Sequence, residues 1–127
     1  MIVDKFSGKI PTTKNKYRNK KCYYNNIKFD SMKERDRYIF LNRARNIGQI
    51  IDLETHVKYP IHMDGKLICK YIADFVYKKQ DPATKEWVIV VEDVKGVETP
   101  IFRLKRRMMQ VVWGVDVRVV KTACLPI

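Results

Sequence analysis

The chain has 127 residues, of which 46% are hydrophobic, and its 26 Lys and Arg against 14 Asp and Glu give a formal net charge of +12. This length and apolar content predict one domain with one core and exclude a wholly disordered chain. No apolar run reaches the ~20 residues of a membrane span, and the N-terminus lacks a signal-peptide pattern, so we expect no membrane partner.

The excess of basic residues favours a polyanionic partner, nucleic acid before an acidic membrane surface. The alternative is a basic protein that is merely soluble, but the clustering of the charges favours nucleic acid. The three cysteines show no C-x-x-C spacing, which predicts a reduced cytosolic compartment without a disulfide framework or zinc knuckle. They are Cys22, Cys69 and Cys124.

Residues 1–21 are polar, show no periodicity and contain Pro11, so they predict a flexible basic arm ahead of a single domain at 22–127. The arm holds one acid, Asp4, and seven basic residues: Lys5, Lys9, Lys14, Lys16, Arg18, Lys20 and Lys21. The last five are candidate contacts to nucleic acid.

Strand patterns alternate with helix patterns after the arm. Asn25-Asn26 predicts a turn within a short strand from Tyr23 to Phe29, and Asp64-Gly65 predicts a tight hairpin. The run from Trp87 to Lys95 is nearly all apolar, which is typical of a central strand covered on both faces. Further strands are expected from Ile50 to about His62, from Leu67 to Tyr77 and from Val115 to Val120.

Two helices are predicted from their end signals. Asp30-Ser31 caps a helix that runs to about Asn46 or Ile47, where Gly48 follows. Thr99-Pro100 supplies the N-cap and first-turn proline of a second helix through about Val112. The order helix, strand, strand, strand, helix, strand predicts an α/β fold, a mixed sheet with flanking helices.

The second helix carries two sets of residues. Apolar residues at helical spacing are expected in the core: Ile101, Leu104, Met108 and Met109. The basic residues form its solvated face, which is either plain surface or a phosphate-binding ridge: Arg103, Lys105, Arg106 and Arg107.

Acidic residues stand late in two successive predicted strands, at Asp74 and in Asp93-Val94-Lys95. Asp74 in its apolar run either pairs with a lysine or caps a turn, or it belongs to a site, because a buried carboxylate needs a cationic partner. Side chains alternate along a strand, so Asp93 and Lys95 share one face while Glu92 points to the other. Two convergent carboxylates with a lysine can hold a divalent metal and activate water. We therefore prefer Asp93 to Glu92, a choice that a one-residue slip of register would reverse.

Other candidates have simpler explanations. Asp64-Gly65-Lys66 repeats the Asp-x-Lys triplet, but at a hairpin tip, where Asp-Gly has a conformational use. His56 and His62 lack a third ligand nearby, so a structural or surface role is favoured. Glu34 stays open between two roles: its helical spacing to Tyr38 and Leu41 places it toward the core, while Ser31-Met32-Lys33-Glu34 also matches a capping box.

The ordered set Glu34, Asp74 and Asp93-Val94-Lys95 resembles the PD-(D/E)XK nuclease superfamily, whose core is αβββαβ, the restriction-endonuclease-like fold. The nearest pattern is that of small phage nucleases, including the endonuclease I group that cleaves DNA junctions. Their motifs stand here as Lys33-Glu34-Arg35, Ala73-Asp74-Phe75 and Asp93-Val94-Lys95-Gly96, with Ala73 in place of the proline of the superfamily name. The chain is also similar, over about residues 25–120, to an uncharacterised phage and prophage family.

The resemblance implies a metal-dependent DNA endonuclease. Asp74 and Asp93 would bind Mg²⁺ or Mn²⁺, Glu34 would complete a second metal site or position the water, and Lys95 would orient the water and stabilise the charged phosphorane. It also implies a phage or prophage origin, hence a bacterial cytoplasm, and selectivity for branched DNA in recombination, for which we expect a homodimer. A non-catalytic DNA-binding accessory protein and a sequence-specific restriction- or transposase-type nuclease are the alternatives.

Overall fold

The computed structural model describes residues 21–127, so the predicted arm lies outside the described residues except for Lys21, which is exposed. The elements are β1 (Cys22–Tyr24), β2 (Ile27–Phe29), α2 (Met32–Asn46), β3 (Ile50–Met63), β4 (Lys66–Gln80), β5 (Trp87–Val94), α3 (Pro100–Met108), the π-helical turn η2 (Met109–Trp113) and β6 (Val117–Val120).

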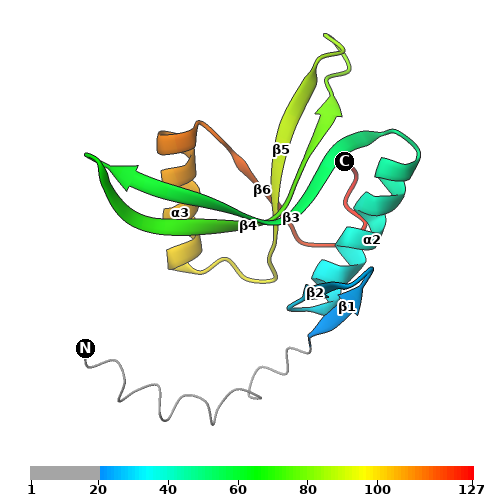
Figure 1. Cartoon of the computed structure of the whole chain (residues 1–127), viewed down its shortest axis with the longest axis horizontal. Helices are drawn as coiled ribbons and strands as arrows, with labels where there is room; N and C mark the ends of the chain where they lie inside the picture. The colour runs from blue at the N-terminus through cyan, green and yellow to red at the C-terminus, as the bar shows by residue number, and fades with distance from the viewer. Residues whose placement is uncertain (1–20) are drawn as a thin grey trace.

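One mixed sheet, in the order β3-β4-β5-β6, organises the chain (Figure 1). β3 pairs antiparallel with β4, and β4 with β5, whereas β5 and β6 are parallel. A parallel pair needs a crossover, which α3 and η2 supply. The α/β class, the mixed sheet and the order helix, strand, strand, strand, helix, strand are therefore confirmed.

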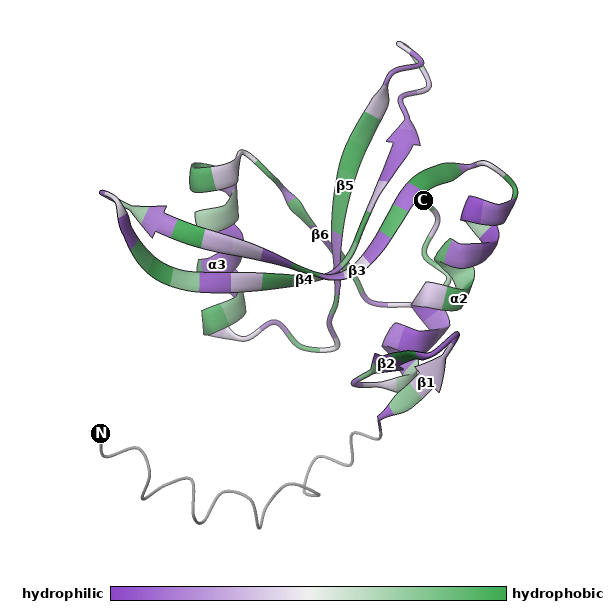
Figure 2. Cartoon of the chain, viewed as in Figure 1, coloured by the Kyte–Doolittle hydropathy of each residue, from purple (hydrophilic) through white to green (hydrophobic). Residues whose placement is uncertain are grey.

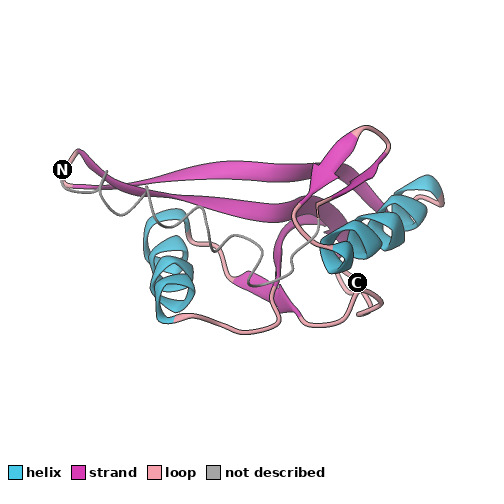
Figure 3. Ribbon diagram, turned by 90° about the horizontal axis from the view of Figure 1, so that it is seen from below, coloured by secondary structure: helices cyan, strands magenta, loops and turns pink. Residues whose placement is uncertain are grey.

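The two helices lie below the same side of the long β3–β4 ribbon, at its opposite ends (Figure 3). Each covers its own apolar cluster. The cluster at α2 includes Phe29, Leu41, Phe75, Tyr77 and Val94, and the cluster at α3 includes Ile61, Tyr71, Val91, Phe102 and Met109. The boundary between the two clusters crosses β4 between Ala73 and Phe75.

The predicted end signals work as expected. Ser31 Oγ accepts a hydrogen bond from the Glu34 amide at 3.1 Å, and Thr99 Oγ1 accepts one from the Phe102 amide at 3.1 Å. Asp64 and Gly65 both have positive φ, 51° and 75°, as a two-residue hairpin of this twist requires.

The predicted turn at Asn25-Asn26 is confirmed: both residues adopt positive φ and divide the segment from Tyr23 to Phe29 into the hairpin of β1 and β2. One strand prediction needs correction. The run from Trp87 is covered only in its second half: Trp87, Val88 and Ile89 are exposed, because β6 pairs only with Val91–Val94. Figure 2 shows this hydrophobic segment of β5 in the ribbon that projects with β4 beyond the rest of the sheet.

The predicted core of the second helix is half wrong. Met109 is fully buried and Met108 partly buried, but Ile101 and Leu104 are 62% and 55% exposed. The residue that anchors α3 is Phe102, which is 6% exposed. Helical spacing defined an apolar stripe, but the helix contacts the sheet along a neighbouring stripe.

A buried ion pair joins the first long helix, the sheet and the C-terminal segment. Arg37 on α2 and Glu92 on β5 are both fully buried. The guanidinium donates to both carboxylate oxygens, at 2.9 and 2.7 Å. Arg37 also donates to the carbonyls of Ala123 and Leu125, and Glu92 accepts from Tyr77. Each charge is thereby compensated, which makes burial of the pair tolerable.

Glu92→Gln is expected to lower the free energy of unfolding by roughly 3–5 kcal/mol, because the Arg37 charge stays buried without its partner. Urea titration followed by circular dichroism measures the change. Asp36→Asn is the matched control, since the Arg35–Asp36 pair, 3.0 Å apart, lies at the surface and should contribute about 0–1 kcal/mol. Equal losses of stability in the two variants would contradict a structural role for the buried pair.

Candidate active site

The candidate site lies where β4 and β5 diverge. Their ladder ends at the pair Phe75↔Glu92, and the adjacent residues beyond this end are Asp74 on β4 and Asp93 on β5. Beyond this fork the Val94 amide has no ladder partner on β4, and it donates instead to Asp74 Oδ2 at 2.8 Å. The end of the ladder therefore leaves a backbone donor that holds the Asp74 carboxyl beside β5.

Asp93 is almost fully buried and faces Asp74. Tyr71 donates its hydroxyl hydrogen to Asp93 Oδ2 at 2.5 Å. Burial, and secondly the charge of Asp93, raise the pKa of Tyr71 well above its usual range, so this hydroxyl stays a donor at neutral pH. Sequence reasoning missed Tyr71: it stands an odd number of residues from Asp74, and only the bend of β4 brings it to the same site.

Lys95 completes the group on the same face as Asp93. Its Nζ lies 3.8 Å from Asp93 Oδ1 and 4.8 Å from the centroid of the Phe102 ring, within cation–π distance. The ammonium is thus held between a carboxylate and an aromatic face while a third of the side chain remains exposed. Glu92 points to the opposite face, where it forms the ion pair with Arg37. This agrees with the prediction of Asp93, and not Glu92, as the site residue.

Asp93 destabilises the charged form of Asp74. Burial, and then the hydrogen bond and negative charge of Asp93, raise the pKa of Asp74 from 3.8 to about 9. In the absence of a cation, Asp74 is therefore protonated at neutral pH. A divalent cation in place of that proton would remove the same repulsion.

Glu34 stands at the edge of the site. Burial, and secondly the charge of Asp30, raise its pKa, while a hydrogen bond from the Asp30 backbone lowers it. Asp93 and Lys95 are close enough to act on the same pKa in opposite directions. Glu34 therefore combines a hydrogen bond with the Asp30 backbone, next to the N-cap Ser31, with electrostatic contact to the site.

The chemistry of the donor set fits a hard cation. Within residues 21–127 no three His, Cys, Asp or Glu side chains form a group that could hold a metal ion, so Glu34 does not join the two aspartates as a third ligand. Mg²⁺ in proteins commonly keeps several waters and uses one or two carboxylates together with substrate phosphates. Asp74 and Asp93 meet that smaller requirement.

A pocket of about 260 Å³ opens beside the fork. Its lining combines site residues with basic and apolar ones: Lys70, Tyr71, Ile72, Asp93, Lys95, Thr99, Ile101, Phe102 and Lys105. Of the four basic residues of the predicted ridge, only Lys105 reaches this pocket. Arg103, Arg106 and Arg107 line a separate hollow with Glu98.

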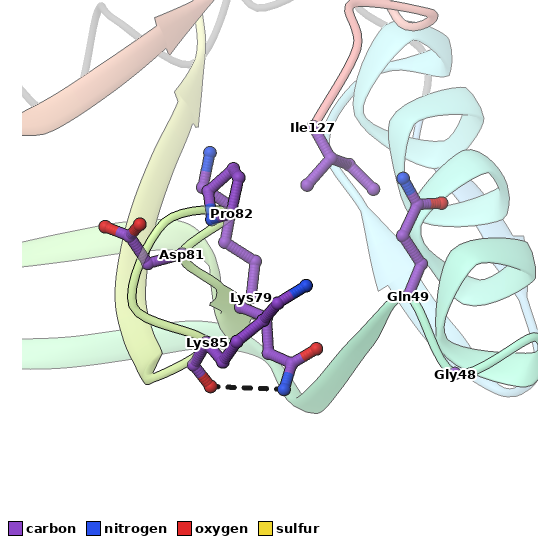
Figure 4. Close-up of a pocket in the computed structure, with 8 residues that line it drawn as sticks. Gly48, Gln49, Lys79, Asp81, Pro82, Lys85 and Ile127 are labelled. Atoms are coloured by element: carbon purple, nitrogen blue, oxygen red, sulfur yellow. Dashed lines mark hydrogen bonds between the residues drawn. The ribbon is translucent and has the colours of Figure 1, made fainter.

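A larger pocket of about 350 Å³ lies elsewhere, between the end of α2, the β4–β5 turn and the C-terminal Ile127 (Figure 4). Lys79 and Lys85 line it, and a bond of 3.1 Å from the Gln80 side chain to the Lys85 carbonyl closes the turn. None of the candidate residues lies there. The fork-side pocket thus lies at the middle of β4, at residues 70–72, and this second pocket lies at its C-terminal end, at residues 79–80.

Comparison with known proteins gives a family. Residues 14–124 match a family described as "Protein of unknown function (DUF1064)". No curated protein matches the chain, and no solved structure does. Among the described residues, no helix is long and apolar enough to cross a membrane.

Asp74→Asn is expected to stabilise the protein at neutral pH when no divalent cation is present. The folded protein raises the Asp74 pKa to about 9, so folding favours the protonated carboxyl group. The free energy of unfolding that this group contributes is therefore fully present below about pH 4 and is lost as the pH rises through 9. Asparagine accepts from Val94 and donates to Asp93, as protonated Asp74 does, but cannot release a proton. The gain should be roughly 1–3 kcal/mol at neutral pH and grow toward pH 9.

Urea unfolding in EDTA at about pH 5, 7 and 9 measures this difference. Asp64→Asn, at the exposed hairpin tip, is the control and should keep the pH dependence of the wild type. If Asp74→Asn also kept that dependence, the mutual repulsion of Asp74 and Asp93 would not be its source.

Proposed function

The chain belongs to the DUF1064 family, and we propose that it is a metal-dependent DNA endonuclease of the PD-(D/E)XK type. The observation that carries the proposal is the convergence of Asp74, Asp93 and Lys95 at the fork of β4 and β5. These are the residues on which the sequence resemblance rests. The element order around them is the one that the resemblance implies.

The two aspartates are the residues that would hold Mg²⁺ or Mn²⁺, with Glu34 at the edge of the site to position water. A bound divalent ion supplies a water of lowered pKa and neutralises charge on the phosphate. The hydroxyl of Tyr71 and the amide of Val94 fix the two carboxyl groups from opposite strands, so the ligands are oriented before a cation arrives.

Lys95 has a separate task. Its ammonium lies beside Asp93, over the Phe102 ring, and faces the pocket. There it stabilises the negative charge that develops on a phosphodiester under attack. Because Phe102 and Asp93 already hold it in place, little side-chain entropy remains to be lost when substrate binds.

The charge of the chain supports DNA as the substrate. The net charge of +12 includes Lys70 and Lys105 in the lining of the pocket and the basic residues at 1–21, which lie outside the described residues except for Lys21. As further parts of the proposal, the enzyme is a homodimer that cuts branched DNA during recombination, in the bacterial cytoplasm, and is encoded by a phage or prophage.

Cleavage of a four-way junction and of its linear duplex, side by side, with Mg²⁺ and with EDTA, tests the proposal. We expect Mg²⁺-dependent nicking that falls by roughly 10²–10³-fold or more in Asp74→Asn, Asp93→Asn and Lys95→Met. Asp64→Asn is a matched control, because Asp64-Gly65-Lys66 repeats the triplet at an exposed turn. Full cleavage by Asp93→Asn would sink the assignment.

Salt-sensitive binding without cleavage would instead favour the non-catalytic accessory protein, and a defined set of cut sites on linear duplex would favour the sequence-specific nuclease.

Glu34→Gln separates the two roles of Glu34. Glutamine can still accept from the Asp30 backbone, so the free energy of unfolding should change little, about 0.5 kcal/mol or less. If Glu34 acts in the site, cleavage should nevertheless fall by about tenfold or more, since the negative charge is removed. Urea unfolding and the cleavage rate of the same preparation give both values. Loss of stability with an unchanged rate would assign Glu34 to the helix cap alone.

A further inference from the structure

The β3–β4 ribbon continues well past the fork. Residues 57–73, called here the β3–β4 arm, pair only with each other, from Val57↔Ala73 to Met63↔Lys66. Figures 1 and 3 show this arm leaving the sheet and passing over α3. A two-stranded ribbon of this kind needs support on one face, which leaves the other face available.

One face of the arm is anchored to the α3 region. Ile61 and Tyr71 are buried there. Trp113 donates its indole N–H to the Pro60 carbonyl at 3.0 Å, and its ring meets that of Tyr59 edge-on, with centroids 5.2 Å apart. Lys105 Nζ donates to the Lys70 carbonyl at 3.2 Å. These contacts hold the arm at a fixed angle to the candidate site.

The opposite face is exposed and basic. Along β4 side chains alternate, so Lys70 and Ile72 share the face opposite the buried Tyr71 and Ala73, and Lys58 joins them by pairing with Ile72. Lys58 and Lys70 are exposed, and Ile72 is half exposed. The two lysines are diagonal neighbours across the ladder, about 7–8 Å apart at Cα. Two cations therefore stand on the exposed face of the arm, and one of them, Lys70, also lines the fork-side pocket together with Asp93.

The excess of lysines over acids on the arm favours a polyanion as its binding partner. Residues 57–73 contain Lys58, Lys66 and Lys70 but one acid, Asp64, at the tip. A second copy laid on this face by two-fold symmetry would bring lysines against lysines. A duplex offers phosphates along its length, and a two-stranded ribbon is narrow enough to lie in its major groove.

We propose that the β3–β4 arm is a DNA-binding element whose Lys58 and Lys70 contact phosphates flanking the strand held at the fork. The inference rests on the proposed function only in taking DNA as the partner. Neither lysine was among the candidates from the sequence, since the register of β3 and β4 is needed to place them on one face of the arm.

The test is the affinity of the full chain for a linear duplex over a series of salt concentrations, in EDTA, for wild type and for Lys58→Gln with Lys70→Gln. The logarithm of the affinity falls linearly with the logarithm of the salt concentration, and losing one phosphate-binding lysine should reduce the magnitude of this salt slope by about 1. The double variant should therefore lose about 2 from its slope, and its affinity should weaken roughly tenfold at moderate salt. Lys79→Gln with Lys85→Gln removes the same charge at the other end of β4 and should keep the slope of the wild type.

Equal slopes in the two double variants would overturn the proposal, because the weaker binding would then reflect net charge alone. So would a change of oligomeric state with unchanged affinity for DNA, which light scattering would detect and which would make the arm a subunit contact. Because binding is measured without a divalent cation, a failure to cleave DNA does not decide this result, and the two proposals fail separately.

Discussion

The buried ion pair of Arg37 and Glu92 is the constraint on which the arrangement of the site depends. Two charges with no exposure must satisfy each other, and here one guanidinium also holds two carbonyls of the C-terminal segment. Because Glu92 must pair with Arg37 on α2, its side chain must lie on the face of β5 that α2 covers. Asp93, the next residue, is thereby fixed on the other face. The choice between two adjacent acids, which a slip of one residue would reverse, is thus decided by a salt bridge on the far side of the strand.

The fork explains why the carboxylates come together at all. Two antiparallel strands that kept their ladder would have satisfied the Val94 amide with a backbone carbonyl. The separation of β4 from β5 after Phe75↔Glu92 leaves that amide for Asp74, and Asp93 follows directly opposite. Burial and the charge of Asp93 together raise the pKa of Asp74, so the fold holds this carboxyl group in its charged form only at a cost.

Sequence reasoning succeeded where one local rule determined the outcome. The caps at Ser31 and Thr99, the Asp64-Gly65 turn and the alternation that separates Glu92 from Asp93 each depend on a few neighbouring residues. It failed where tertiary packing chose between equivalent patterns. The stripe of α3 that meets the sheet contains Phe102 instead of Ile101 and Leu104, and nothing local distinguishes the two stripes. Tyr71 was out of reach for the same reason, since the bend of β4 brings it to Asp93.

The charges around α3 divide the predicted ridge into parts with different electrostatic surroundings. Glu98 lies 3.7 Å from Arg106 and 3.3 Å from Lys121, so part of the positive charge on that side is neutralised within the protein. Lys105 forms no ion pair with an acid of residues 21–127 and turns instead to the Lys70 carbonyl, on the side of the fork. Uncompensated cations attract phosphate more strongly than paired ones, because no internal ion pair must first be broken. Lys95 and Lys105 therefore place positive charge at the fork-side pocket, and Arg106, although paired with Glu98, still acts on the pKa of Tyr71.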